Sequence, residues 1–138
     1  MNIEDIGRNL PALVTALFVS VLFVQSGLDK FFDWRGNLEW LNGHFSKTFL
    51  APLVPVLLAT ITAMELSAGL LAAVGVVYLL FTSSTLIIFW STVLAALALL
   101  ALFFGQRIAK DYPGAAVIVP YFILVGLLMY VTNPFARP

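Results

Sequence analysis

Residues 49–105 read FLAPLVPVLLATITAMELSAGLLAAVGVVYLLFTSSTLIIFWSTVLAALALLALFFG, and Glu65 is the only charged residue among them. A helix needs about 20 apolar residues to cross a hydrocarbon core about 30 Å thick. This stretch is therefore too long for one span, and we expect two helices, at 49–74 and 79–105. The only turn chemistry between them lies in the segment from Gly75 to Ser84, where Thr82, Ser83 and Ser84 follow the glycine.

One further apolar run precedes this stretch and another follows it. The first, at 10–32, is longer than the apolar region of a cleavable signal peptide, so we expect a retained helix. The last, at 114–131, lies between Pro113 and Pro134, and proline is typical of both helix starts and helix stops. The runs are continuous and do not alternate, which excludes a barrel. The predicted fold class is all-α, an integral membrane four-helix bundle that forms a single transmembrane domain over residues 1–138.

Composition supports a bilayer as the solvent. Hydrophobic residues make up 62% of the chain and charged residues 10%, whereas an ordinary soluble domain has about 25% charged residues. Seven basic and seven acidic residues give a net charge of zero, so nothing favours nucleic acid as a partner. The absence of cysteine excludes disulfides, thiolate metal sites and thiol–disulfide chemistry.

The loop after the first helix carries an apolar pattern of its own. Large apolar residues recur there at steps of three and four, at Phe31, Trp34, Leu38, Leu41, Phe45 and Phe49. This spacing predicts a short amphipathic helix, at 34–46, in the membrane interface. It has two interpretations: an aromatic belt that anchors the bundle, or a lid or partner-docking surface beside a lipid-soluble ligand.

The distribution of basic residues predicts the orientation. The first and third loops hold five of them, Lys30, Arg35, Lys47, Arg107 and Lys110, whereas Arg8 and Arg137 lie on the other side. Basic residues collect in cytoplasmic loops. We therefore expect both termini outside and the protein in a bacterial inner membrane.

Glu65 is the strongest candidate for a functional group. A charged side chain at the centre of a span is costly, so it should face the bundle interior. Thr62, Gly69 and Ala72 lie on the same helical stripe, and small residues there would let another helix approach closely. Glu65 is either a structural carboxyl bonded across the bundle or a group that relays protons or binds a quinone-like head.

A polar cluster ends the first helix. Its members are Gln25, Ser26, Gly27, Asp29, Lys30 and Asp33. One interpretation is an ordinary helix end among lipid headgroups, where Lys30 pairs with a nearby carboxylate. The other is the mouth of an intramembrane pocket that ends at Glu65, and Glu65, Thr62, Gln25 and Gly69 are then the candidate ligand-binding residues.

The usual redox ligands are missing from the sequence. His44 is the only histidine and is expected in a loop, so neither paired haem ligands nor a multi-histidine metal centre can come from this chain alone. We predict no metal site and no intrinsic cofactor, and we do not expect the chain to be catalytic by itself. A bound quinone would press against an aromatic ring such as Phe89, Trp90 or Phe122.

Two motifs resemble the DoxX-like family of small four-helix membrane proteins, which includes the DoxD subunits. The first helix ends in FVQSGLDKFF at residues 23–32, similar to the family's glycine followed three residues later by lysine. The second helix contains MELSAGLLAAVG at residues 64–75, similar to its glutamate, glycine-leucine-leucine and closing glycine. The four-helix layout extends the resemblance over nearly the whole chain. It implies that Gly27, Lys30, Glu65, Gly69 and Gly75 are the family positions.

The chain departs from the family pattern at one point. Members often carry an arginine about ten residues before the glycine of the first helix, where this sequence has Thr15-Ala16-Leu17 and only Arg8 lies further upstream. If that arginine normally pairs with the glutamate, its absence argues against an ion pair at Glu65.

Three functions remain open. The family includes small subunits of thiosulfate:quinone oxidoreductase and of terminal quinol oxidase complexes, so the resemblance implies an accessory subunit of a bacterial redox or respiratory complex. Such a subunit would pack against other membrane subunits and shape a quinone or lipid pocket around Glu65. A second possibility is a quinone-linked oxidoreductase subunit of the thiosulfate:quinone type. The third, a small transporter or channel, rests on the one buried carboxyl.

Overall fold

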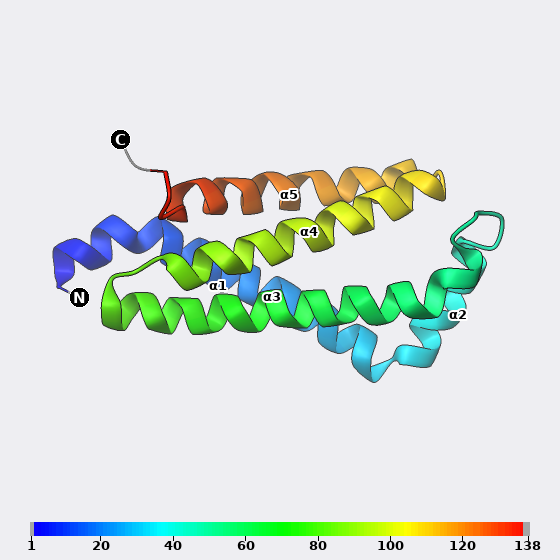
Figure 1. Ribbon diagram of the computed structural model, residues 1–138, viewed down its shortest axis with the longest axis horizontal. Helices are drawn as coiled ribbons and strands as arrows, with labels where there is room; N and C mark the ends of the chain where they lie inside the picture. Colours follow the sequence, from blue (N-terminus) through cyan, green and yellow to red (C-terminus); the bar gives the residue numbers. More distant parts are fainter. Residues whose placement is uncertain (1, 137–138) are drawn as a thin grey trace.

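The computed structural model describes residues 2–136 and is all-α (Figure 1). Four helices are long and apolar enough to cross a membrane, as the sequence predicts. In chain order the elements are α1 (Ile3–Phe32), α2 (Trp34–His44), the 3₁₀ turn η1 (Ala51–Leu53), α3 (Val54–Thr82), α4 (Leu86–Ile108) and α5 (Tyr112–Thr132). The chain is therefore a multi-pass membrane protein in which the short helix α2 occupies the first loop.

The four long helices form an antiparallel bundle in which α1 packs on α3, α3 on α4, and α4 on α5. The contact between α1 and α5 is much smaller. Figure 1 shows why: at the end that carries α2, the last turns of α1 lie along the lower edge of the molecule and α5 lies along the upper edge. Helices α1 and α5 therefore diverge toward that end.

The first helix begins at Ile3, seven residues earlier than the predicted start at residue 10. Asn2 caps it: the Asn2 side chain accepts a hydrogen bond from the Asp5 backbone, and the Asp5 side chain accepts one from the backbone N–H of Asn2. Such a reciprocal capping box satisfies two of the four free N–H groups at a helix start. The local cap extends the helix beyond the apolar span.

The turn between α3 and α4 lies later than predicted. Helix α3 continues to Thr82 instead of ending at 74, and α4 begins at Leu86 instead of 79. Ser83 ends α3 in the left-handed region with φ of 61°. Gly75 is interior to α3 and does not form a turn. A Cβ at this position would lie 2.8 Å from the backbone N of Ile88 on α4. The glycine therefore serves the close approach of α3 and α4.

The other boundaries shift by fewer residues. Helix α2 ends at His44 and not at 46, α3 begins at Val54 and not at 49, α4 extends to Ile108, and α5 spans Tyr112–Thr132. His44 is thus the last residue of the short helix predicted within the first loop. Between α2 and α3, Phe45 and Leu50 pack on Val54 to form a small apolar cluster with Leu38, Leu41 and Ile108. This cluster fixes α2 against the ends of α3 and α4.

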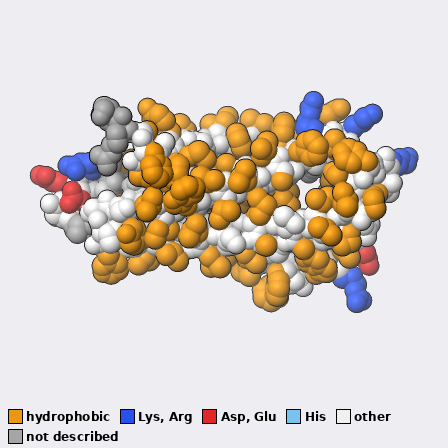
Figure 2. Space-filling view, viewed as in Figure 1, with side chains coloured by type: hydrophobic (Ala, Val, Ile, Leu, Met, Phe, Trp, Pro, Cys, Tyr) orange, Lys and Arg blue, Asp and Glu red, His pale blue; other side chains and the backbone are white. Residues whose placement is uncertain are grey.

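The surface agrees with a bilayer environment. Figure 2 shows hydrophobic side chains over the middle of the molecule and basic side chains gathered mainly at one end. That end holds α2 and the α4–α5 turn, and so the five basic residues of the first and third loops. Arg8 is at the opposite end in α1, and Arg137 lies outside the described residues.

Candidate functional site

Glu65 lies inside the bundle, with 3% of its side chain exposed. Two residues of α1 meet its carboxylate. The hydroxyl of Ser26 donates a hydrogen bond of 2.5 Å to Oε2, and Nζ of Lys30 lies 2.9 Å from Oε1. The prediction that Glu65 faces the interior is confirmed.

The ammonium group of Lys30 is shared between two residues. It donates a hydrogen bond to Ser26 Oγ at 2.9 Å, while its contact with Glu65 Oε1 has the distance of an ion pair without the angle of a hydrogen bond, so Oε1 accepts none. Glu65 thus has an ionic partner although the chain has no arginine near the start of the first helix, because Lys30 of α1 reaches it. Lys30 forms no ion pair with Asp29 or Asp33, the carboxylates near it at the end of α1.

Glycines allow α1 and α3 to come close enough for this contact. A Cβ on Gly69 would lie 2.7 Å from the backbone N of Val24, and a Cβ on Gly27 would lie 2.7 Å from side-chain carbons of Leu66. The hydroxyl of Ser20 adds a hydrogen bond of 2.9 Å to the carbonyl oxygen of Gly69. Small residues drive helix association in lipid in this way, because they bring two backbones into van der Waals contact.

Thr62 and Ala72 are buried on the Glu65 stripe as predicted. The hydroxyl of Thr62 donates a hydrogen bond of 2.7 Å to the carbonyl of Leu58, which leaves no free hydroxyl proton for a ligand. Gly69 touches α1 and has no open side. Of the candidate ligand-binding residues on α3, Glu65 alone carries a charge, and that charge is already paired.

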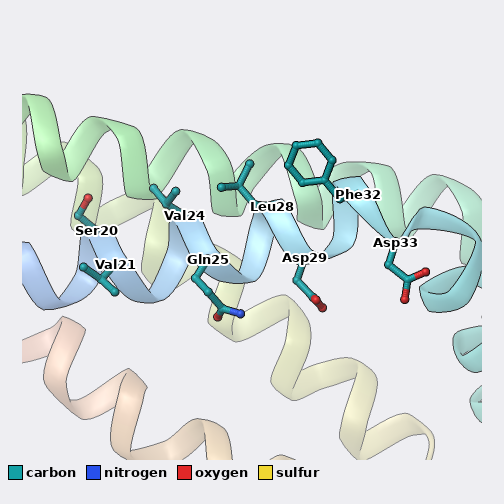
Figure 3. Close-up of a pocket in the computed structure, with 8 residues that line it drawn as sticks. All are labelled: Ser20, Val21, Val24, Gln25, Leu28, Asp29, Phe32 and Asp33. Carbon is teal, nitrogen blue, oxygen red and sulfur yellow. The ribbon is translucent and has the colours of Figure 1, made fainter.

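The polar cluster at the end of α1 is divided between two faces of the helix. Ser26 and Lys30, four residues apart, meet Glu65. Gln25, Asp29 and Asp33 are exposed and line a shallow groove of about 700 Å³ on the outer side of α1. In Figure 3 the side chains of Gln25 and Asp29 point the same way. Gln25 lines this groove and not the pocket that Lys30 lines, because Gln25 and its neighbour Ser26 point about 100° apart around the helix.

A second pocket reaches Lys30 from the other side. It lies between α2, α3 and α4, has a volume of about 240 Å³, and has predominantly apolar walls that include Leu57, Ile61 and Leu102. Its polar lining includes Lys30, His44 and Gln106. The lysine thus connects the buried carboxylate of Glu65 with a cavity that opens near the predicted cytoplasmic end.

His44 is held at this pocket by three contacts. Its Nε2 lies 2.8 Å from Oε1 of Gln106 and 3.7 Å from a carboxylate oxygen of Asp111. Its ring stacks on Trp40 at 4.4 Å between centroids. The contact with Gln106 therefore joins α2 to the end of α4. The sequence analysis missed this group, although the spacing of four residues between Trp40 and His44 places both rings on one helical face.

The aromatic residues considered for a quinone ring lie away from this pocket. Phe89 and Trp90 pack with Phe135, near the start of α4 and therefore at the opposite end of the bundle. Phe122 lines a separate apolar groove between α4 and α5. Trp40, Phe45 and Phe104, together with the ring of His44, are the aromatic residues that line the pocket with Lys30.

Comparison with known proteins adds no assignment: the chain matches no protein-family model, no curated protein and no solved structure.

Proposed function

We propose that this protein is a small membrane subunit of a bacterial redox or respiratory complex, and that it binds the head of a lipid-soluble molecule, a quinone by preference, between α2, α3 and α4. The observation that carries the proposal is the pocket of about 240 Å³ with apolar walls and Lys30, His44 and Gln106 in its lining. An amphipathic ligand needs this combination, because a few placed polar groups orient it and apolar walls take up its body.

Lys30 is the donor best placed for a quinone oxygen. An ammonium group has three N–H bonds; one is directed to Ser26 and the ion pair with Glu65 occupies a second direction. The third remains for a ligand in the cavity that Lys30 lines. Glu65 and Ser26 then act as positioning residues, since they hold the ammonium group at the wall.

The ligand is expected to arrive from the bilayer. Thr60 and Leu57, on the exposed side of α3, belong to the pocket lining, so the cavity reaches the lipid-facing surface. Trp40 is largely exposed, at 60%, and lies over the pocket with His44. This arrangement supports the lid interpretation of the first loop.

The role of a subunit rests on two further points. Nearly all of the described chain is membrane-length helix with short connections, which leaves little room for a separate substrate domain. The motifs around Gly27 and Glu65 also resemble the DoxX-like family, whose members include subunits of quinone-linked complexes. We place the α2 end in the cytoplasm, because the basic residues of the first and third loops lie there.

Binding can be measured through Trp40. In a protein where Trp34 and Trp90 are replaced by Phe, a short-chain ubiquinone analogue should quench the remaining fluorescence saturably in nanodiscs. Ala101→Phe fills the pocket from α4 and should abolish saturation, whereas Ala59→Phe, on an exposed position of α3 outside the pocket lining, should not. Linear quenching that is the same in both variants would remove the pocket from the proposal.

The subunit role needs a separate measurement. Extraction from the native membrane in mild detergent should yield a stoichiometric partner that carries redox centres. A protein that purifies alone and turns over a substrate would contradict this part of the proposal.

A further inference from the structure

The outer side of α1 carries exposed polar side chains within the length of its membrane span. We define the α1 outer face by Val21, Gln25, Leu28, Asp29, Phe32 and Asp33, which line the groove shown in Figure 3. Among the described residues, neither the amide of Gln25 nor the carboxylate of Asp29 has a side-chain hydrogen bond or an ion pair. Both are exposed.

The depth of Gln25 follows from the residues beside it. Val24 contacts Gly69 and Gly27 contacts Leu66, and both partners lie near the midpoint of α3. Gln25 therefore lies close to the middle of the bilayer, Asp29 roughly 6 Å nearer to the α2 end, and Asp33 roughly 6 Å further, at a rise of about 1.5 Å per residue. Lipid tails offer no hydrogen-bond partner at the depth of Gln25, so an exposed amide there is unfavourable.

Thr60 of α3 shows that a polar side chain exposed on the surface of this protein can still be hydrogen-bonded. Thr60 faces outward, but its hydroxyl donates a hydrogen bond of 2.9 Å to the carbonyl of Val56 in its own helix. Gln25 has no such internal bond. A primary amide in this position is a group that bonds across helices.

We propose that the α1 outer face binds a transmembrane helix of another subunit, which presents a hydrogen-bonding side chain opposite Gln25 and a Lys or Arg opposite Asp29. The face supplies acceptors in one row at steps of four residues, Gln25, Asp29 and Asp33. The complementary helix carries donors at the same one-turn steps, because opposite charges at membrane depth must pair.

A second copy of this chain does not satisfy the face. Two copies related by an axis along the membrane normal would place Asp29 opposite Asp29 and Asp33 opposite Asp33, so like charges would meet. Lys30 cannot offset them, because it lies on another side of α1 with Glu65. Lipid is also unsuitable, since a cationic headgroup reaches Asp33 at the interface but not Gln25 near the midplane. The charges therefore favour a different, cationic chain.

This inference rests on the proposed role as a subunit but not on the proposed ligand pocket. That pocket is formed by Lys30 and residues of α2, α3 and α4, and it shares no lining residue with the groove. A photoreactive benzoylphenylalanine at Val21 should cross-link, in the native membrane, to one transmembrane helix of another protein. The cross-linked peptide should contain a Lys or Arg one turn from an amide or hydroxyl residue. The same probe at Val56, an exposed position on α3, serves as the control and should give only lipid adducts.

Variants test the chemistry of the contact. Gln25→Leu should lower the cross-link yield roughly three- to tenfold, the range expected for one interhelical hydrogen bond, and Asp29→Lys should lower it at least as much. Replacing the partner's basic residue by Glu should restore the yield with Asp29→Lys. Thr60→Val is the matched control, because its hydroxyl is already bonded within α3, and it should leave the yield unchanged.

Three results would overturn the proposal: cross-links to a second copy of this chain, cross-links to lipid alone, or a partner helix without a basic residue at this depth. Failure of the charge exchange to restore the yield would do the same. The quinone titration separates the two proposals, since Asp29→Lys should still show saturable quenching of Trp40. If the quinone analogue does not quench Trp40 saturably while the cross-link still forms, only the proposed ligand pocket is contradicted.

Discussion

The contact between α1 and α3 and the attachment of α5 show two different ways of holding a helix in a bilayer. In the α3 span 39% of the residues are buried, against 17% in the α5 span. The α1–α3 contact contains a buried ion pair and two glycines at backbone contact distance. Helix α5 buries Ala115, Val125, Leu128 and Thr132, and a Cβ on Gly126 would meet nothing within 4 Å.

Polar contacts lie at the two ends of α5: one caps the helix itself, and the other joins its end to the residue before α4. Asp111 accepts a hydrogen bond from the N–H of Gly114 at 3.0 Å, and the hydroxyl of Thr85 donates to the carbonyl of Thr132 at 2.8 Å. In lipid there is no hydrophobic driving force for one helix to pack on another, so association depends on close van der Waals packing and interhelical hydrogen bonds. Stability should therefore be concentrated in the α1–α3 contact, and mutations should reveal this asymmetry.

The largest effect is expected from Glu65→Leu. It leaves Lys30 without a counter-charge inside the bundle, which costs about 3 kcal/mol in comparable buried pairs. Denaturation in mixed detergent micelles should show this loss. The double variant Lys30→Met/Glu65→Leu should recover most of it, because no charge then remains.

Thr62→Val is the matched control for Glu65→Leu, one turn away on the same face. Its hydroxyl is bonded within its own helix, so the loss should stay below about 1.5 kcal/mol, the net worth of an ordinary hydrogen bond. Equal stability of the Glu65→Leu variant and the unmodified protein would mean that the ion pair is dispensable.

The second effect compares glycines on the two sides of the bundle. Gly69→Ala places a methyl group against the backbone of Val24, and overpacking of this kind costs about 1–3 kcal/mol. Gly126→Ala meets open space and replaces a poor helix former, so stability should be unchanged or rise by up to about 1 kcal/mol. The same micelle denaturation measures both variants, and similar losses in the two would refute the asymmetry.

A smaller and more local effect is expected at the start of α5. Asp111→Ala removes the side-chain cap and should cost about 1 kcal/mol. Hydrogen exchange should accelerate at the backbone amide of Gly114, because its N–H loses its acceptor. It should stay unchanged at the backbone amides of α1 and α3 around Ser26 and Glu65. Uniform acceleration through α1 and α3 would show that α5 supports the whole fold.

The smallest effect is expected from Thr60→Val on the exposed side of α3. The hydroxyl already bonds the backbone of its own helix, so stability should change by less than about 0.5 kcal/mol. A larger loss in the micelle assay would indicate that this position touches a partner or a ligand.

The sequence predicts the number of spans and the inward face of Glu65 correctly, because apolar length and the cost of a buried charge act locally. Its interpretation of Gly75 as part of the turn is wrong. A glycine permits a turn and a close helix contact equally well, and only the position of Ile88 on α4 distinguishes the two. The start of α1 was predicted at residue 10, although Asn2 and Asp5 have the spacing of a capping box that begins a helix at Ile3.

The ionic partner of Glu65 could not be identified from the sequence alone. The sequence indicated only that Lys30 could pair with a nearby carboxylate, and the missing arginine left an ion pair at Glu65 in question. Ser26 and Lys30 are four residues apart and so share a face, which is a usable signal. Nothing in the sequence states which face of α1 meets α3, since Gln25 and Asp29 repeat the same spacing one residue earlier.

The sequence by itself determined a four-span membrane protein with one costly carboxyl directed inward, because a bilayer tolerates long apolar helices and penalises lone charges. Only the tertiary structure decided that Lys30 neutralises Glu65, that a pocket opens beside the lysine, and that Gln25 and Asp29 remain without partners. The physical reason is the rotation of α1 about its own axis, which the glycine contacts with α3 fix. A rotation of about 100°, one residue along the helix, would exchange the two sets of polar side chains.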